Sequence, residues 1–480
     1  MTAPPSLGDM DPEEFRRHAH RVADWIADYF SNPGAYPVLA QVQPGEVADS
    51  LPDRAPEQGE PFERIFADFE RLVMPGVTHW NHPGFFAYFA ISGSAPGVLA
   101  EFLAAALNVQ AMLWRTSPAA TELEAVVLGW LRRLIGLPDT FEGVIYDTAS
   151  ISTLHALAAA REATVPEVRA RGLAGSADAR LRVYCSDQAH SSIDKAVILL
   201  GLGHESLRRI DTDDRFRMIP AALAAAIDED RAGGWQPLAV VATVGTTSTT
   251  SVDPVEAIGE IARRERAWLH VDAAYAGVAA MLPGYEKLLR GAEHADSLVV
   301  NPHKWLFTPF DLSVLYCRRM DVVRRAFSLT PEYLVTTDGP SVRNLMDTGV
   351  QLGRRFRSLK LWMVLRHFGA DGVRAQLAEH IRLAQMFASW VDGSTAFERV
   401  AEVPFSVVCF RAHGGDAHNE RLLEAVNRTG TVFMSHTRLH GTYTLRLAIG
   451  NLHTRELHVA QAWELLNTLH RELGGSVREA

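Results

Sequence analysis

The sequence predicts an α/β protein whose large domain is built on a mixed, mostly parallel sheet with helices on both faces. The first observation is that short apolar, β-branched runs alternate with alanine-rich helical patterns through the middle of the 480-residue chain. Such alternation is typical of parallel sheets covered by helices. The second is a composition of 47% hydrophobic and 22% charged residues, which is average for globular proteins. A chain of this length has room for about two to four domains around a large buried core.

The first expected element is a helix over residues 11–30. Its apolar residues recur at helical spacing, and Asp11-Pro12 suits an N-cap followed by proline at the first helical position. Residues 32–61 are rich in proline and glycine and are expected to form an extended connector. Because a lone amphipathic helix has little stability of its own, we expect it to lie on the main domain or on a second subunit.

The alternating region supplies the sheet. The expected strands cover residues 143–146, 181–185, 238–243, 268–271, 297–300 and 313–316. The expected helices cover residues 122–135, 152–171, 191–200, 219–230 and 255–264. In open sheets of this kind, ligands bind at the carboxyl ends of the strands. Polar residues that follow each strand are therefore the first candidates for a functional site.

The last third of the chain has a different pattern. Helical spacing over residues 361–368 and 373–391 is followed by strands at 407–411 and 442–448 and by a terminal helix from residue 454. This order is typical of a small α+β domain. The expected division is an N-terminal helical arm (1–94), a large ligand-binding domain (95–361) and a small C-terminal domain (362–480).

Composition narrows the class of protein. The formal net charge of −10 argues against a binder of nucleic acid or of anionic membranes. The cysteines Cys185, Cys317 and Cys409 are far apart in sequence and are expected to be free thiols in a reducing compartment, without a metal site. The first residues lack a secretory signal pattern, and no uncharged apolar run reaches membrane-spanning length. We therefore expect a soluble cytoplasmic protein.

Two strand ends carry residues suited to covalent catalysis. Lys304 follows the strand at 297–300 and is flanked by Trp305 and Phe307. Burial there would lower the pKa of its amine and free it for a Schiff base, whereas an ordinary surface lysine is the alternative. Asp272 ends the strand at 268–271, where it could pair with a cationic ring nitrogen or cap a helix. Ala274 would leave room for a flat ring.

Two further strand ends carry residues that could bind a phosphate or an aromatic ring. Thr148, Ala149 and Ser150 lead into a helix, and hydroxyls with free N–H groups at a helix start suit a phosphate. An ordinary N-cap is the competing explanation. His190 follows the strand at 181–185 and could stack on an aromatic ring, or be a plain loop histidine. Each signal alone is weak, but the order of phosphate-type helix start, His, Asp and Lys suggests pyridoxal 5′-phosphate (PLP).

The chain resembles the PLP-dependent group II decarboxylases, and most closely the aromatic-L-amino-acid decarboxylases. The resemblance extends over nearly the whole chain, and the pair HVDAAYAG and NPHKW is highly specific. The segments that carry it are MPGVTHW (74–80), FFAYF (85–89), SPAATELE (117–124), SDQAHSS (186–192), HVDAAYAG (270–277), NPHKW (301–305) and GRRFRSLKLW (353–362). The fold it implies is fold type I, similar to aspartate aminotransferase.

The resemblance implies a role for each strand-end residue. Lys304 looks like the lysine that binds the cofactor covalently, Asp272 like the partner of its ring nitrogen, and Ala274 like the methyl group under one ring face. His190 would stack on the other face and contact the substrate. The other implied cofactor-binding residues are Thr148, Ala149, Ser150, Thr247, Asn301 and His303.

One position departs from the family pattern. Asp147 stands where related enzymes commonly have glycine. Since a carboxylate beside a phosphate is repulsive, we expect its side chain to turn away from the phosphate site.

The reaction type depends on Tyr333, which matches a mobile catalytic loop of the family. It would donate a proton to the substrate carbon after CO2 leaves, closing over the site from the neighbouring subunit. In related aldehyde synthases a phenylalanine stands at this place, so tyrosine favours simple decarboxylation to an amine. A solvent-exposed loop aromatic is the alternative.

The resemblance also implies an aromatic substrate pocket made by Trp80, Tyr88 and Phe89. Ala90-Ile91, Gln110 and Met112 differ from the animal enzymes, so the pocket is expected to differ from that of dopa-handling relatives. Tryptophan, tyrosine, phenylalanine and dopa-type substrates all remain open.

Other functions of three kinds stay open at this point. One is a decarboxylase of a non-aromatic amino acid or an aldehyde synthase of the same fold. Another is an aminotransferase, for which Arg446 could hold the substrate carboxylate. A third is a non-catalytic protein that keeps the fold. In each case the N-terminal helix and arm suit a homodimer, with active sites at the subunit interface.

Overall fold

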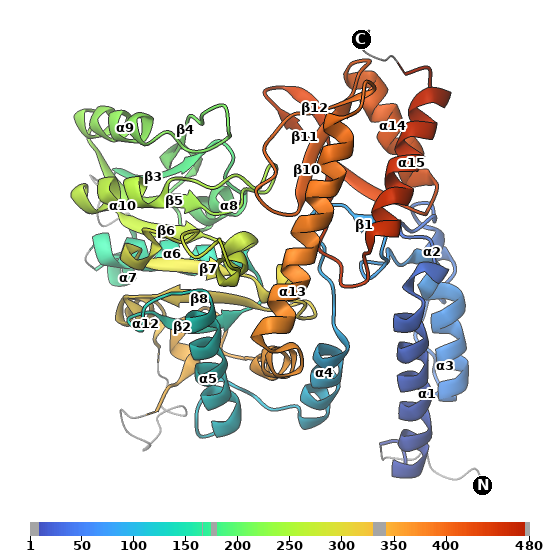
Figure 1. The fold of residues 1–480 in the computed structure, drawn as a ribbon. Helices are drawn as coiled ribbons and strands as arrows, with labels where there is room; N and C mark the ends of the chain where they lie inside the picture. Colours follow the sequence, from blue (N-terminus) through green and yellow to red (C-terminus); the bar gives the residue numbers. More distant parts are fainter. Residues whose placement is uncertain (1–8, 166, 174–179, 330–341, 476–480) are drawn as a thin grey trace.

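The computed structural model describes residues 9–165, 167–173, 180–329 and 342–475. Within these residues the chain forms a seven-stranded sheet and a five-stranded sheet. The larger sheet and its helices form one side of the molecule, and the smaller sheet lies beside it with the C-terminal helices (Figure 1). No helix in the described ranges is both long and apolar enough to cross a membrane.

The seven-stranded sheet has the order β2-β8-β7-β6-β5-β3-β4. Its strands are β2 (Glu142–Tyr146), β3 (Arg180–Ser186), β4 (Leu207–Ile210), β5 (Trp235–Thr243), β6 (Trp268–Asp272), β7 (Ser297–Val300) and β8 (Ser313–Cys317). Neighbours are parallel except where β8 pairs with β2 and β7. The carboxyl ends of β2, β3, β5, β6 and β7 therefore all point to the same end of the sheet.

Helices cover both faces of this sheet. One face packs against α5 (Pro118–Leu134), α9 (Pro220–Ala232) and α10 (Val255–Arg264), and the other against α6 (Ala149–Thr164), α8 (Ser192–Leu199) and α12 (Met320–Phe327). Val240 and Val241 of β5 are both fully buried, one in each core. Burial on both faces explains why the central strands are continuous apolar runs rather than alternating ones.

The five-stranded sheet has the order β1-β11-β12-β10-β9. Its strands are β1 (Phe85–Phe86), β9 (Phe397–Arg399), β10 (Val407–Ala412), β11 (Phe433–Leu439) and β12 (Thr442–Ala448). β1 comes from the N-terminal segment and pairs in parallel with β11. The sheet packs against α14 (Asp416–Arg428), α15 (Glu456–Glu472) and the second half of α13 (Ser358–Asp392).

Helix α13 connects the two cores. Its first half packs against α4 (Ala95–Leu107) and α5, and its second half against α15 and β10. Gly369 inside it has φ 61° and ψ 175°, which interrupts the helical backbone between the two halves. The expected domain boundary at 361/362 falls inside this helix, eight residues before that glycine.

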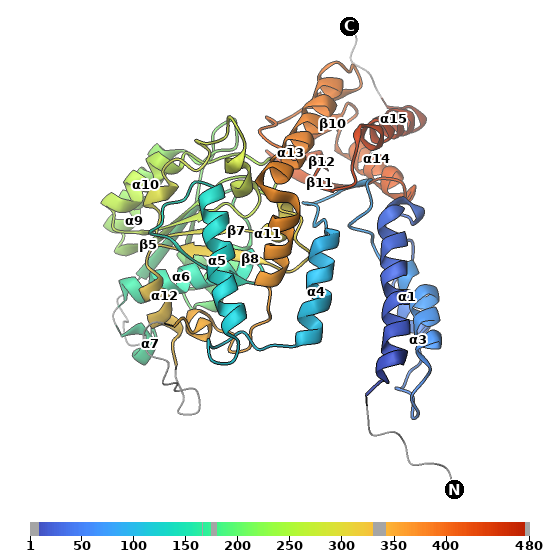
Figure 2. The ribbon, with the colours of Figure 1, turned by 60° about the horizontal axis from the view of Figure 1, so that its bottom comes forward.

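The N-terminal helices stand apart from the large domain. α1 (Pro12–Ser31) and α3 (Phe62–Asp68) lie side by side next to the small domain, and α1 faces α4 across a gap (Figures 1 and 2). The predicted cap is confirmed, since the Asp11 carboxylate accepts the N–H groups of Glu13 and Glu14. The expected extended connector contains two short helices, a 3-10 turn at Pro33–Ala35 and α2 (Glu46–Asp49).

The structure corrects the end of one expected helix and adds four strands to the expected ones. The helix expected over 152–171 ends at Thr164, and a separate turn, α7 (Val168–Arg171), follows. Val165 is extended (φ −113°, ψ 100°) because it precedes a proline, which disfavours helical backbone. The short strands β1 and β9, the edge strand β4 and the strand β11 were not expected. The six strands expected in the large sheet are all present.

Candidate active site

A cavity of about 180 Å³ opens at the carboxyl ends of the parallel strands. Residues that end or follow β2, β3, β5, β6 and β7 line it together with one residue of the N-terminal segment. The lining residues are Phe89, Thr148, Ala149, Ser150, His190, Thr243, Gly245, Thr247, Asp272, Ala274, Tyr275, Asn301, His303 and Lys304. The structure thus brings together all ten residues that the sequence predicts to hold a cofactor.

Lys304 reaches the cavity from α11 (Pro302–Trp305), a short helix that begins directly after β7. The neighbouring Trp305 is fully buried and donates its Nε1–H to His380 Nδ1 at 2.9 Å, which holds this turn in place. Burial lowers the pKa of the Lys304 amine, and the Asp272 carboxylate opposes that shift. A lowered pKa increases the fraction of neutral amine, the form that attacks a carbonyl carbon.

Asp272 is the last residue of β6, the strand between β5 and β7. It is 8% exposed, and its Oδ1 accepts the N–H of Ala274 at 3.1 Å. Among the described residues, no cationic side chain is within ion-pairing distance of this carboxylate. A buried carboxylate at a cavity wall favours a cationic group inside the cavity, because burial of an unpaired charge is costly.

The N-terminus of α6 faces the same cavity. Thr148 is its N-cap, Ala149 and Ser150 begin the helix, and no described side chain caps this end. The first N–H groups of the helix are therefore available to an anion, and the helix dipole favours negative charge there.

Two further polar atoms of the cavity lack a partner. Asn301 Oδ1 and Thr243 Oγ1 are buried without a hydrogen bond in the part of the chain that the structure describes. Beside them, His303 accepts the Leu312 N–H through Nδ1 at 3.0 Å, and burial lowers its pKa to about 3. Since buried polar atoms normally have hydrogen-bond partners, the cavity fits a polar ligand with a phosphate, such as PLP.

An aromatic stack closes one side of the cavity. The ring of Phe89 lies 3.9 Å from that of Tyr275, and Tyr275 lies 4.8 Å from Trp305, with nearly parallel planes. The Lys304 Nζ is 5.3 Å from the Phe89 ring centroid. The rings therefore form an apolar wall beside the buried amine.

Sequence reasoning missed three lining residues, namely Thr243, Gly245 and Tyr275. Thr243 ends an expected strand, so the strand-end rule could have found it. Gly245 has φ +88°, and a Cβ there would lie 2.7 Å from Ala276 Cβ, so a larger residue would not fit. Tyr275 gives no signal of its own beyond its place beside Ala274.

His190 and Thr247 lie at the exposed mouth of the cavity. His190 Nδ1 accepts the Ser192 N–H at 3.1 Å, so a neutral ring carries its proton on Nε2.

Arg446 is buried behind Thr247. It donates from Nη2 to Thr247 O at 2.7 Å and from Nε to Ser248 O at 2.8 Å. These contacts commit the guanidinium to the loop backbone, which weakens the idea of an aminotransferase-type carboxylate clamp.

Two predicted substrate-binding residues, Trp80 and Tyr88, lie outside the cavity. They stack on each other with ring centroids 5.9 Å apart. Tyr88 is 54% exposed. Tyr333 lies outside the described residues.

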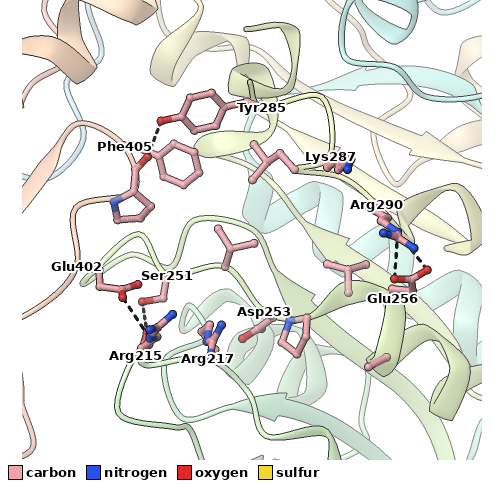
Figure 3. A pocket seen from close by; sticks show the side chains of 16 residues that line it. Arg215, Arg217, Ser251, Asp253, Glu256, Tyr285, Lys287, Arg290, Glu402 and Phe405 are labelled. Carbon is pink, nitrogen blue, oxygen red and sulfur yellow. Dashed lines mark hydrogen bonds and ion pairs between the residues drawn. The ribbon is translucent and has the colours of Figure 1, made fainter. Parts of the chain in front are cut away.

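A larger pocket of about 520 Å³ lies on the other side of the segment that follows β5, between the large domain and the small one (Figure 3). Four of its charged side chains form ion pairs with one another. Arg215 pairs with Glu402 at 3.2 Å and Arg290 with Glu256 at 3.1 Å. Because Lys304 and the α6 N-terminus lie outside it, this pocket is a weaker candidate for the chemistry than the smaller cavity.

Comparison with known proteins identifies the family to which this chain belongs. Residues 44–413 match the family described as "Pyridoxal-dependent decarboxylase conserved domain". The aromatic-L-amino-acid decarboxylase of Sus scrofa is 41% identical, with 97% of this chain and 98% of that protein covered. A phenylacetaldehyde synthase of Arabidopsis thaliana is also 41% identical, with 96% of each chain covered. The crystal structure of Oryza sativa TDC with PLP and tryptamine has a TM-score of 0.94 and 37% identity, with 98% of this chain and 100% of that chain covered.

Proposed function

The chain belongs to the pyridoxal-dependent decarboxylases, and from that premise we propose that it converts an aromatic L-amino acid to the corresponding amine and CO2. The predicted family, the fold-type-I α/β architecture, the PLP cofactor and the amino-acid decarboxylase activity are confirmed. The observation that carries the assignment of residues is the meeting of Lys304, Asp272 and the α6 N-terminus in one cavity.

Each group of the cavity has a proposed task. The Lys304 amine binds the cofactor aldehyde, the α6 start with Asn301 and His303 holds its phosphate, and Asp272 faces its ring nitrogen. When bound, PLP accepts the electrons that CO2 leaves behind on the substrate. The buried Asp272 carboxylate stabilises positive charge on the ring without any reorganisation during the reaction. Ala274 and His190 are proposed to face the two sides of the ring.

The substrate proposal depends on the aromatic residues near the cavity. Phe89 lines it, and Trp80 and Tyr88 lie outward along the same segment. Because Tyr88 is exposed, a neighbouring subunit would complete this wall. Relatives named for aromatic amino acids and the tryptamine in the Oryza structure support the same class. Ile91, Gln110 and Met112 set this chain's own preference within the class.

An amine assay with a panel of amino acids tests the proposal. The holoprotein is incubated with tryptophan, tyrosine, phenylalanine, dopa, glutamate and leucine, and CO2 and amine are quantified. We expect equal amounts of CO2 and amine with at least one aromatic substrate. Turnover of glutamate or leucine alone would contradict the aromatic class, and keto-acid products would contradict decarboxylation.

Tyr333 is the proposed proton donor to the substrate carbon after CO2 leaves. Changing Tyr333 to phenylalanine should shift the product from amine toward aldehyde, because without the hydroxyl the electron-rich carbon is left to react with O2. Aldehyde, ammonia and hydrogen peroxide should then rise together. Tyr36→Phe, in the N-terminal segment, is the control. An unchanged product profile in Tyr333→Phe would contradict the role.

We further propose a homodimer with active sites at the subunit interface. An apolar groove of about 680 Å³ lies between α1 and α4. On α4, Leu99, Phe102, Leu103 and Leu107 each have about half of their surface exposed. An apolar surface of this extent is typical of a protein interface. The groove and the separate N-terminal helices support a partner that fills the gap (Figure 2).

Changing Phe102 to aspartate should convert the dimer to monomer and lower activity, because a charge on the buried face of an interface is costly. Sedimentation velocity measures the mass directly. Leu199→Asp is the matched control, since Leu199 is 72% exposed on α8, away from the groove. A dimer in Phe102→Asp, or a monomer in the wild type, would contradict the assembly.

The division into an arm (1–94), a large domain (95–361) and a small domain (362–480) is retained as a proposal. The two separate sheets support it, while α13 crosses the second boundary. A cytoplasmic location is also proposed, because Cys185, Cys317 and Cys409 are all buried free thiols, as is usual in a reducing compartment.

A further inference from the structure

Asp147 connects β2 to α6 at the edge of the cavity. Its Oδ1 accepts the N–H of Thr148 at 2.5 Å and the hydroxyl of Thr148 at 3.0 Å. Asp147 itself does not line the cavity, in agreement with the expectation that its side chain turns away. The carboxylate nevertheless reaches the cavity through Thr148, whose side chain it holds.

Thr148 belongs to the helix start proposed to hold the phosphate. It is the N-cap of α6, and it lines the cavity with Ala149 and Ser150. A hydroxyl has one proton, so Thr148 Oγ1 can donate either to Asp147 or to an anion in the cavity, but not to both. While Asp147 holds that proton, the hydroxyl offers the anion only its lone pairs.

The negative charge of Asp147 also disfavours phosphate binding. The Asp147 carboxylate and a phosphate compete for the same end of the α6 dipole, and like charges this close repel each other. Asp147 is only partly buried, so its charge is partly screened by solvent. The effect on binding is therefore moderate rather than prohibitive.

We propose that Asp147 weakens cofactor binding by competing with the phosphate for Thr148, and so makes the cofactor of this chain readily exchangeable. This inference rests on the proposed placement of the PLP phosphate at the α6 start. The consequence is regulatory. The fraction of enzyme that holds the cofactor, and with it the activity, changes with the concentration of free PLP. In the wild type this change occurs at higher PLP concentrations than in Asp147→Asn.

The test measures cofactor affinity rather than turnover. Apoprotein is titrated with PLP, and with pyridoxal, which has the aldehyde but no phosphate, using absorbance and intrinsic fluorescence. Asp147→Asn keeps the shape and one oxygen acceptor but removes the charge. We expect its Kd for PLP to fall about tenfold, while the Kd for pyridoxal changes less than about twofold. The inhibition constant of inorganic phosphate, measured by its competition with PLP, should also fall in the variant.

Two further variants isolate the cause. Glu142→Gln removes the same charge from the exposed opposite end of β2 and should leave the Kd for PLP within about twofold of wild type. Thr148→Val removes the shared hydroxyl, so adding Asp147→Asn to it should improve binding less than in the wild-type background.

The outcomes separate this inference from the proposed function. An unchanged or weaker PLP affinity in folded Asp147→Asn overturns the role of Asp147 and leaves the decarboxylase site intact. An equal gain for pyridoxal and PLP also overturns it, because the effect would then not involve the phosphate. If neither protein binds PLP through Lys304, the proposed site itself fails.

Discussion

Lys304→Ala should lower amine formation by at least about 10³-fold, the largest effect we expect from any single substitution in this chain. Alanine removes the only amine in the cavity that the structure describes. It also removes the group through which the aldehyde of the cofactor would be bound covalently. Turnover is measured as CO2 release from the preferred aromatic substrate, with saturating PLP.

The covalent link itself can be located by borohydride reduction and peptide mass spectrometry. The chain has four lysines, at positions 195, 287, 304 and 360, so the result is unambiguous. Lys360 is held by Glu101 and by the carbonyls of Pro309 and Asp311, and Lys195 and Lys287 are exposed. We expect the adduct at Lys304 alone, and Lys287→Ala as control should keep full activity.

Lys304→Ala also serves as the negative control for reduction. An adduct that persists in this variant, or that forms at another lysine of the wild type, would contradict the assignment of the cavity.

Asp272→Asn should lower kcat/KM by about 10²–10³-fold. Asparagine has nearly the same shape and can still accept the Ala274 N–H that Asp272 Oδ1 accepts at 3.1 Å. What it lacks is the negative charge that stabilises a cationic ring nitrogen in a buried site. The loss is therefore electrostatic, and the fold should be retained.

The matched control is Asp296→Asn. The Asp296 carboxylate accepts the Leu269 N–H at 2.9 Å, near the end of β6 that is opposite to Asp272. The control therefore removes a carboxylate charge beside the same strand but away from the cavity. Activity of this control should stay within about threefold of wild type. Activity of Asp272→Asn within about fivefold of wild type, with PLP bound, would contradict the role of Asp272.

Much of the architecture could be predicted because it follows from local patterns. The run at 297–300 contains three successive apolar residues, Leu298, Val299 and Val300, and β7 has the expected bounds Ser297–Val300. Asp11 precedes a proline and an amphipathic stretch, and it caps α1 as expected. Edge elements escaped prediction: β4 is only partly buried over most of its length and lacks the apolar run of the central strands.

The site could be predicted in part for the same reason. Parallel strands end at one edge, so polar residues after successive strands meet there even when they are far apart in sequence. That rule predicts that Lys304, Asp272, His190 and the start of α6 meet at one edge of the sheet, and all of them line the cavity. The chemical roles of these residues stay predictions that the substitutions above will test.

By itself, the sequence determined which segments are buried strands, which residues follow them and which family the chain belongs to, because these depend on local periodicity and residue type. Only the tertiary structure decided which side chains come together from distant segments. It placed Phe89 against Tyr275, left Trp80 and Tyr88 outside the cavity, and set the Asp147 carboxylate on Thr148. The physical reason is that such contacts depend on how elements pack and on which rotamer each side chain adopts, and neither is encoded in a local pattern.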